Sequence, residues 1–218
     1  MGEIISMPSD AVCFENTLSF GKFKIYNHYS NQSTCDNIEL CDNHIYFNAV
    51  IKNETINVLI LYIQSIINNA HILHDSRIYI HINSKGGIVK DLLTFIEYKK
   101  TISNEIFSIV EQECVDCGIL MAALCNYRII KKNAICKLNK LATYSSGDTN
   151  EYMHYWCCFK QCDNNDVELG YFKTVLYDII CNLIDSKITY EKLDKYFQEN
   201  QQWDSKKYKK LGLADEIV

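Results

Sequence analysis

Segments with strand period and segments with helix period alternate through the middle of the chain, and this pattern restricts the fold more than any other feature. Predicted strands cover residues 45–50, 77–83, 106–110 and 129–138, and predicted helices cover residues 54–69, 88–100 and 118–124. The alternation continues for about a hundred residues, which is typical of stacked βαβ units around a mostly parallel sheet. The sequence therefore predicts an α/β fold.

The two ends of the chain differ from this middle part. The first 42 residues are polar with little periodicity, and we interpret them as an N-terminal arm whose order depends on a partner. A polar, aromatic and cysteine-containing segment follows Leu141, and then a long helix is predicted over 167–184 and a charged helix over 190–199. No linker rich in Gly, Ser or Pro interrupts this part of the chain. We expect one domain over residues 43–218 with a protruding helical arm.

Composition limits the kinds of partner that the chain suits. With 218 residues, 48% of them hydrophobic, the chain can bury a substantial single core. The formal net charge is −5, whereas binding to nucleic acid requires a basic face, so we expect no nucleic-acid partner. No apolar run reaches about 18 residues, so we expect no transmembrane helix and no membrane partner.

Eleven cysteines are present, and an odd number leaves at least one thiol that cannot pair within the chain. The first twelve residues lack the basic start and apolar run of a secretion signal. The cysteines are therefore interpreted as reduced thiols that behave as small hydrophobes. This interpretation predicts a cytoplasmic or another reducing location.

Residues 82–87, I-N-S-K-G-G, end a predicted strand with two glycines directly before a predicted helix. Glycine tolerates positive φ and lets a second backbone approach closely. Main-chain amides at such a turn can bind an anion or a developing oxyanion. A tight turn without any ligand is the alternative interpretation.

The motif resembles the I-N-S-P-G-G signature of the proteolytic subunit of the Clp protease (ClpP), a family of barrel-forming serine peptidases. The resemblance continues to residues 114–118, C-V-D-C-G, where the family has an A-A-S-M-G nucleophile turn. It also includes residues 210–217, K-L-G-L-A-D-E-I, which are similar to the family ending E-Y-G-L-V-D-S-I. Residues 43–218 are covered, and the resemblance implies the stacked, spiral βαβ fold that ClpP shares with crotonases.

The resemblance also implies the positions of a catalytic triad, and this chain has none of the family residues there. Asp116 takes the position of the nucleophilic serine, Asn139 that of the histidine and Asn200 that of the aspartate. An asparagine cannot act as a general base at neutral pH, and an aspartate is a poor nucleophile toward an amide. We therefore expect a catalytically inactive homologue.

The oxyanion-hole positions of the family fall on Gly87 and Cys117. Because the donors there are main-chain amides, they can persist although the triad is lost. Lys85 replaces the signature proline, which adds a charge and removes the fixed φ of that residue.

Cys114 and Cys117 form a C-x-x-C spacing on either side of Asp116. Such a pair can exchange a disulfide or share a metal, but we favour buried thiols on a core turn. Cys117 as a displaced nucleophile would need a histidine within reach. The histidines of the chain all lie outside the expected position: His28, His44, His71, His74, His81 and His154.

A second cluster lies in the cysteine-containing segment and consists of His154, Cys157, Cys158 and Cys162. Three of these residues on one helix face would suit zinc. The neighbouring aromatic residues suit an apolar contact surface, which we favour. We therefore expect no bound metal and no cofactor.

In the family, the segment between the histidine and aspartate positions forms a helical handle that joins two rings. The resemblance places the handle at about residues 143–185 here, and this segment is about a dozen residues longer than usual. We therefore expect a structural or regulatory ring subunit, heptameric, formed with itself or with active paralogues. An ATP-driven AAA+ unfoldase is the further partner that the resemblance implies. An active endopeptidase with a rearranged site and a crotonase-like acyl-CoA enzyme using Asp116 remain the alternatives.

Overall fold

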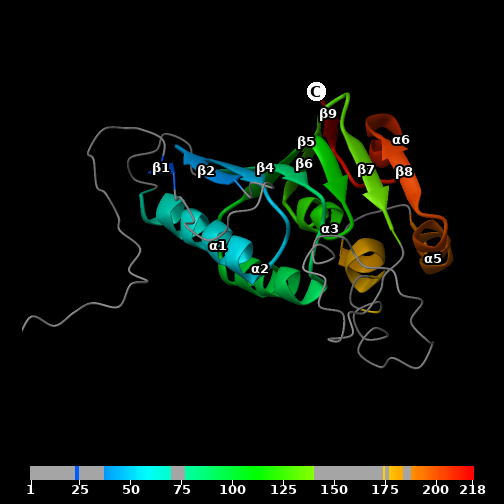
Figure 1. The fold of residues 1–218 in the computed structure, drawn as a ribbon, viewed down its shortest axis with the longest axis horizontal. Coiled ribbons are helices and arrows are strands. Elements are labelled where there is room, and N and C mark those ends of the chain that lie inside the picture. The colour runs from blue at the N-terminus through cyan, green and yellow to red at the C-terminus, as the bar shows by residue number, and fades with distance from the viewer. Residues whose placement is uncertain (1–22, 25–36, 70–76, 140–173, 175–176, 184–187) are drawn as a thin grey trace, which may run out of the picture.

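A computed structural model describes residues 23–24, 37–69, 77–139, 174, 177–183 and 188–218 (Figure 1). The strands are β1 (Phe23–Lys24), β2 (Asn37–Cys41), β3 (His44–Asn48), β4 (Ile78–Ser84), β5 (Ile106–Val115), β6 (Tyr127–Ile130), β7 (Ile135–Leu138), β8 (Gln201–Asp204) and β9 (Glu216–Ile217). The helices are α1 (Asn53–Asn68), α2 (Val89–Thr101), α3 (Cys117–Ala123), α5 (Tyr190–Gln198) and α6 (Ser205–Lys210), with a π-helical turn over Ile179–Leu183.

All described strands belong to one mixed sheet, in the order β1-β2-β3-β4-β5-β6-β9, with β7 paired to β5 and β8 paired to β7. Strands β3, β4, β5 and β6 run parallel to one another. They are connected through α1, α2 and α3, so each connection is a βαβ unit. The α/β prediction is therefore confirmed.

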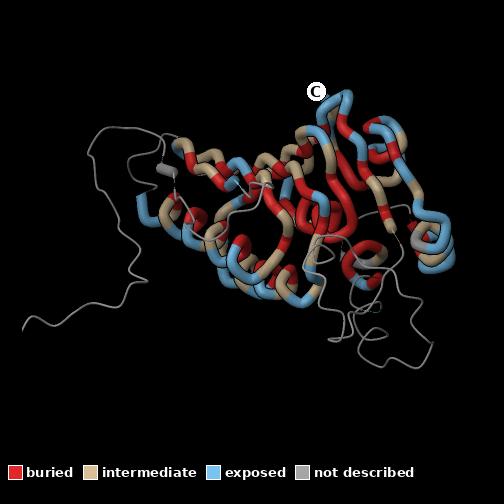
Figure 2. Tube along the Cα trace, viewed as in Figure 1, coloured by how far each residue is buried: buried red, intermediate tan, exposed pale blue. Residues whose placement is uncertain are grey.

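The core lies between the sheet and its helices. Strand β4 alternates strictly, with Ile78, Ile80 and Ile82 fully buried and the residues between them partly exposed. Helix α1 buries residues at helical spacing: Ile56, Leu59, Tyr62, Ile63 and Ile66. Figure 1 shows α1, α2 and α3 on the same face of the sheet, and Figure 2 shows the buried residues concentrated where these layers meet.

Strand β5 is longer than predicted and pairs with two different strands along one edge. Its first half pairs with β6 and its second half, from Glu113 to Val115, pairs with β7. The single strand predicted over residues 129–138 is therefore wrong. Lys131–Ala134 forms a turn, closed by a hydrogen bond of 2.9 Å from the Ala134 amide to the Lys131 carbonyl, because this polar segment separates two apolar ones.

Two further strands extend the sheet beyond the sequence pattern. Strand β2 lies inside the predicted N-terminal arm and pairs antiparallel with β3 over five residues. Ile38 and Leu40 alternate with polar residues and are buried, a pattern too short to stand out in the sequence. Strand β8 pairs antiparallel with β7, and together they extend the sheet past the end of β6.

Most of the predicted handle, at residues 143–185, lies outside the described residues. The part described includes Tyr177, Ile179 and Ile180, which are buried in the main core. None of the described helices is both long enough and apolar enough to cross a membrane.

Candidate functional site

The glycine turn after β4 is held against the chain that enters α1. The Ile51 amide donates to the Gly86 carbonyl at 2.7 Å, and the Ile88 amide donates to the Ile51 carbonyl at 2.8 Å. Thr55 fixes the entry to α1, since its Oγ1 donates to the Val50 carbonyl at 2.6 Å. The two main-chain bonds of Ile51 form a short parallel bridge between Ile51 and Gly87.

Both glycines are required by this geometry. Gly86 has φ of 87° and Gly87 has φ of 146°, values at which an L side chain is strained. A Cβ atom at Gly87 would lie 2.1 Å from the Ile51 carbonyl oxygen. Lys85, which replaces the proline of the signature, is exposed at this turn.

Asp116 lies in the turn that joins β5 to α3. Its φ is 45° and its ψ is −107°, and only 5% of the residue is exposed. The Asp116 amide donates to the Lys137 carbonyl of β7 at 3.0 Å, and its carbonyl accepts from the Leu120 amide of α3 at 3.3 Å. The turn is therefore held from both sides in a conformation that few non-glycine residues adopt.

The side chain of Asp116 is bound by Asn139, which directly follows β7. Its Oδ1 accepts a hydrogen bond of 2.6 Å from the Asn139 amide, and its Oδ2 accepts one of 2.9 Å from Asn139 Nδ2. The two residues that the resemblance aligns with nucleophile and general base are thus in direct contact. They form a partly buried pair in which Asp116 accepts and Asn139 donates.

Asn200 lies next to Asn139 by the register of the sheet. In the β7–β8 pair Leu138 is opposite Gln201, so Asn139 and Asn200 are the next residues beyond the paired strands. Asn200 has φ of 50° and connects α5 to β8. The three positions predicted from the sequence are thus brought together from β5–α3, β7 and β8.

The side chains at these three positions differ from the groups that serine-peptidase chemistry uses. A hydroxyl or thiol nucleophile, an imidazole to accept its proton and a carboxylate to orient the imidazole would have to lie in a chain of hydrogen bonds. Here the nucleophile position holds a carboxyl group that already accepts two hydrogen bonds, and the base position holds an amide. A charge at Asp116 would also repel an oxyanion forming beside it.

Gly87 and Cys117, the two oxyanion-hole positions, are also in contact. The Cys117 thiol donates to the Gly87 carbonyl, with 3.3 Å between sulfur and oxygen. In the parallel bridge, Ile51 bonds to the Gly86 carbonyl and the Ile88 amide, the residues on either side of Gly87. The N–H and C=O of Gly87 itself therefore lie on the side away from Ile51, toward α3. The glycine turn and the Asp116 turn are therefore directly joined.

The thiols near the site are buried. Neither Cys114 nor Cys117 forms a disulfide, and Cys114 lies opposite Cys136 in the β5–β7 pair. Burial raises the pKa of the Cys114 thiol well above its usual range, and its hydrogen bond with Cys136 raises it further. Because metal binding and disulfide exchange need a thiolate, this environment favours the interpretation as core residues.

The metal-binding interpretation can be compared with the structure only in the described residues. Among the described ranges, no group of three His, Cys, Asp or Glu residues is arranged to hold a metal ion. The cluster of His154, Cys157, Cys158 and Cys162 lies outside those ranges.

The two described histidines lie on the face of the sheet opposite α3. His44 Nδ1 is 2.8 Å from His81 Nε2, and His81 Nδ1 is 2.6 Å from Glu111 Oε1. Glu111 also pairs with Lys131. Burial alone would raise the pKa of Glu111, but the hydrogen bonds from His81 and Lys131 lower it overall. These histidines are therefore part of a surface network rather than of the Asp116 site. His28, His71, His74 and His154 lie outside the described residues.

Comparison with known proteins supports the fold alone. No protein-family model matches the chain, and no curated protein matches its sequence. Among solved structures, the ClpP protease catalytic domain from Plasmodium falciparum superposes with a TM-score of 0.61 at 19% identity, over 79% of this chain and 83% of that chain. A peptidase from the same organism gives a TM-score of 0.63 at 15% identity, over 81% of this chain and 95% of that chain. The chain therefore has the fold of a ClpP protease catalytic domain, and the resemblance noted in its glycine signature is confirmed at the level of the fold.

Proposed function

We propose that the protein is a non-catalytic homologue of the Clp protease proteolytic subunit and acts as a structural or regulatory ring subunit in ATP-dependent protein degradation. The ring forms with further copies of the chain or with active paralogues. A heptamer and an AAA+ unfoldase partner are the arrangement that the fold resemblance implies. The described cysteines form no disulfide, which supports a reducing compartment such as the cytoplasm as the location.

The bond between Asp116 and Asn139 is the observation that carries this proposal. Two hydrogen bonds occupy the carboxyl oxygens of Asp116, and they come from the residue at the position of the general base. In such enzymes, losing all triad members leaves only weak catalysis from oxyanion stabilisation and binding. A site of this kind retains the shape of the fold without its chemistry.

A partly exposed aromatic row, with the Arg77 guanidinium over its Tyr79 and Phe107 rings, supports a role in assembly. Tyr79, Phe107 and Tyr127 lie side by side on β4, β5 and β6, with ring centres 5.2 Å apart for Tyr79 and Phe107 and 5.3 Å apart for Phe107 and Tyr127. Tyr46 of β3 lies beside this row and stacks on His81. Tyr46 and Tyr127 are more than a third exposed. Helices α1, α2 and α3 cover the opposite face of the sheet (Figure 1). An exposed aromatic surface of this kind is typical of protein–protein contacts.

Peptide hydrolysis tests the loss of chemistry. We expect the purified protein to hydrolyse fluorogenic peptides no faster than its Asp116→Ala variant, and to resist labelling by a serine-reactive fluorophosphonate. A triple variant, Asp116→Ser with Asn139→His and Asn200→Asp, serves as the positive comparison for labelling. Robust turnover that one substitution at Asp116 or Cys117 abolishes would show an active peptidase with a rearranged site.

Native mass tests the ring. We expect the protein to form a ring-sized oligomer alone or after mixing with an active ClpP paralogue, measured by native mass spectrometry. A Tyr46→Asp/Tyr127→Asp variant tests whether the aromatic row takes part in assembly or in partner binding. A strict monomer under both conditions would overturn the ring-subunit proposal.

A further inference from the structure

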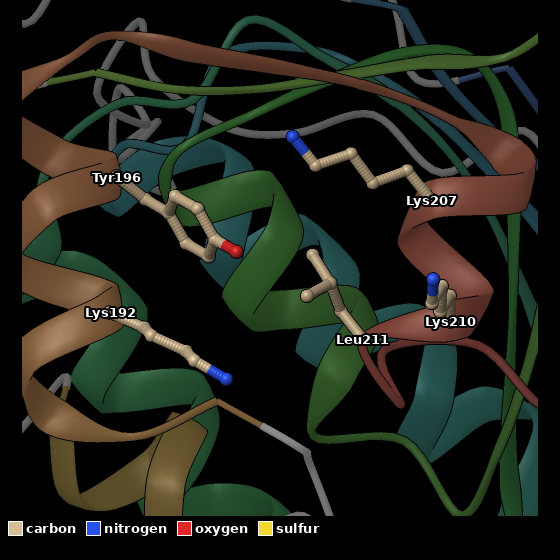
Figure 3. A pocket seen from close by; sticks show the side chains of 5 residues that line it. All are labelled: Lys192, Tyr196, Lys207, Lys210 and Leu211. Carbon is tan, nitrogen blue, oxygen red and sulfur yellow. The ribbon is translucent and has the colours of Figure 1, made fainter.

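A pocket of about 480 Å³ lies between α5 and α6, away from the Asp116 site. It is lined by Lys192 and Tyr196 of α5, by Lys207 and Lys210 of α6, and by Leu211. Figure 3 shows Lys192 and Tyr196 extending from α5 toward α6, Lys207 extending back toward α5, and Leu211 between them. The lining of this cavity thus includes three lysine side chains.

None of the ion pairs between described residues includes a lysine of this cavity. Residues 190–211 contain six lysines against four carboxylates, in a chain whose net charge is −5. Within the described part of the chain, the ion pairs involve Lys195 and Glu199 of α5 but neither Lys192 nor Lys210. The positive charge of the pocket is therefore a local exception on an acidic protein.

Lys207 is positioned by neutral groups. Its Nζ donates to Gln201 Oε1 at 3.0 Å and lies 5.5 Å from the centre of the Tyr196 ring. The start of α6 is fixed as well, since Asp204 Oδ1 accepts from the Lys207 amide at 2.7 Å. These contacts orient the ammonium group without neutralising it, which leaves its charge for a ligand.

We propose that this pocket binds a polyphosphate chain, either as an inorganic polyphosphate or as the tail of a nucleotide. Lysine binds phosphate as a point charge with three donors, and several such charges match an anion with charge on successive groups. The volume is in the range of small-molecule sites. Tyr196 and Leu211 provide an apolar wall on which the organic part of a nucleotide packs.

A polyphosphate suits the pocket better than an acidic peptide. The cations that line the pocket are all lysines. A lysine ammonium group does not offer the planar fork with which arginine binds a carboxylate through two parallel hydrogen bonds. The pocket is also bounded by two short helices, which suits a compact ligand rather than an extended chain. A ligand here would link α5 to α6 across β8, the strand that directly follows Asn200.

Calorimetric titration of the full chain with sodium tripolyphosphate tests this proposal, at low salt and again at higher salt. The variant Lys192→Gln/Lys210→Gln removes two pocket charges that hold no described structural contact. The matched control is Lys206→Gln/Lys209→Gln, which removes the same charge from exposed positions of α6 that do not line the pocket. Folding of both variants is checked by circular dichroism.

We expect tripolyphosphate to bind the native protein, with affinity that falls as salt rises. The pocket variant should bind about tenfold more weakly or worse, whereas the control should lose less than about threefold, because only its long-range attraction changes. Titration with ATP and with adenosine separates the two sources: ATP binding tighter than tripolyphosphate indicates a nucleotide. Equal losses in both variants, no binding of either phosphate, or tighter binding of an oligoglutamate peptide would overturn the proposal. Since the Asp116 site contributes nothing to this pocket, the outcome is independent of the proposed function.

Discussion

The side chain of Asp116 is held by Asn139 through both of its oxygen atoms, at 2.6 Å from the Asn139 amide and 2.9 Å from Asn139 Nδ2. The contact joins the turn after β5 to the end of β7, two segments that the parallel pairing of these strands brings together. The two positions that the resemblance aligns with nucleophile and general base are thus joined by a partly buried pair of hydrogen bonds. The stability of this region therefore depends on the residues at these positions.

Substitutions at Asn139 test that dependence. Asn139→Ala removes one of the two hydrogen bonds and is expected to lower the free energy of unfolding by about 1–2 kcal/mol. Asn139→Asp should cost more at pH 7, because it places a second carboxylate against Asp116. Like-charge repulsion raises the pKa of the added carboxyl, so this extra cost should shrink as pH falls toward the acidic range and grow as pH rises.

Urea unfolding at pH 5 and pH 7 measures both effects. Asn133→Asp, in the exposed turn between β6 and β7, is the matched control with the same change of charge. If Asn139→Asp proves no more destabilising at pH 7 than this control, the contact between positions 116 and 139 does not contribute as described.

The two glycines of the turn should differ in their tolerance of alanine. At Gly87 the added Cβ would lie 2.1 Å from the carbonyl oxygen and 2.7 Å from the amide nitrogen of Ile51, so the backbone bridge must open. We expect Gly87→Ala to cost more than about 4 kcal/mol or to prevent folding. At Gly86 the nearest atom is the Val115 carbonyl oxygen at 2.9 Å, and we expect a loss of about 1–3 kcal/mol.

The melting temperatures of these two variants and of a Gly118→Ala variant measure the difference in stability. Gly118 is helical, and its Cβ would lie 3.2 Å from Cys114 Sγ and 3.3 Å from Ser84 Cβ, which are side-chain atoms. The expected order of destabilisation places Gly87→Ala first. A Gly87→Ala protein as stable as the other two would contradict the close approach of Ile51.

The ion pair of Arg128 and Asp215 makes stability depend on pH. Asp215 accepts bonds from Arg128 Nη2 at 2.7 Å, from Nε at 3.0 Å and from the Arg128 amide at 2.8 Å. Burial alone would raise the pKa of Asp215, but these bonds lower it below its usual 3.8. The stabilisation is therefore present above the unfolded-state pKa and is lost as pH falls through the lower folded-state pKa.

Asp215→Asn should lower the free energy of unfolding by about 1–3 kcal/mol at pH 7, and the difference from the native protein should narrow toward pH 3. Chemical denaturation across this range measures the difference, and Glu105→Gln, at an exposed carboxylate before β5, is the control. A difference that is constant with pH would rule out the charged hydrogen bonds as its source.

Buried thiols should resist alkylation in the native protein. Burial raises the pKa of Cys125 to about 12, and it raises that of Cys114 as well, so neither forms much thiolate at pH 8. Among the described cysteines, Cys41 and Cys181 are partly exposed and should be labelled before Cys114 and Cys125, with Cys41 ahead of Cys181 because burial raises the pKa of Cys181. Peptide mapping after brief treatment with iodoacetamide shows the difference, and labelling in urea shows the full reactivity of each site. Rapid native labelling of Cys114 would instead favour a reactive C-x-x-C pair.

Periodicity was enough to predict the central elements, because they are amphipathic over many residues. Helix α1 and strand β4 lie within one residue of their predicted limits, since their buried residues recur at regular spacing. The split into β6 and β7 was missed although a polar turn begins at Lys131 within the apolar run. Strand β8 was missed because Gln201–Asp204 buries only Trp203, and its pairing depends on a distant partner.

For the candidate site, the sequence predicted the positions of the residues but not the contacts between them. Position along the chain was enough to place Asp116, Asn139 and Asn200 in one site, since the resemblance to a fold fixes where strands end. The two hydrogen bonds between Asp116 and Asn139 could not be predicted from the sequence, because these residues are 23 positions apart and only tertiary packing brings them into contact. The lysine pocket was missed too. Its signal was the run of four lysines in residues 205–210, but the opposing helix contributes Lys192.

The bridge between Ile51 and Gly87 consists entirely of main-chain atoms. Mutation at positions 116, 139 or 200 leaves those atoms in place, so architecture and chemistry are encoded by separate residues in this fold. Natural variants of this protein should accordingly show few changes at Gly86 and Gly87, whatever residues they carry at positions 116, 139 and 200.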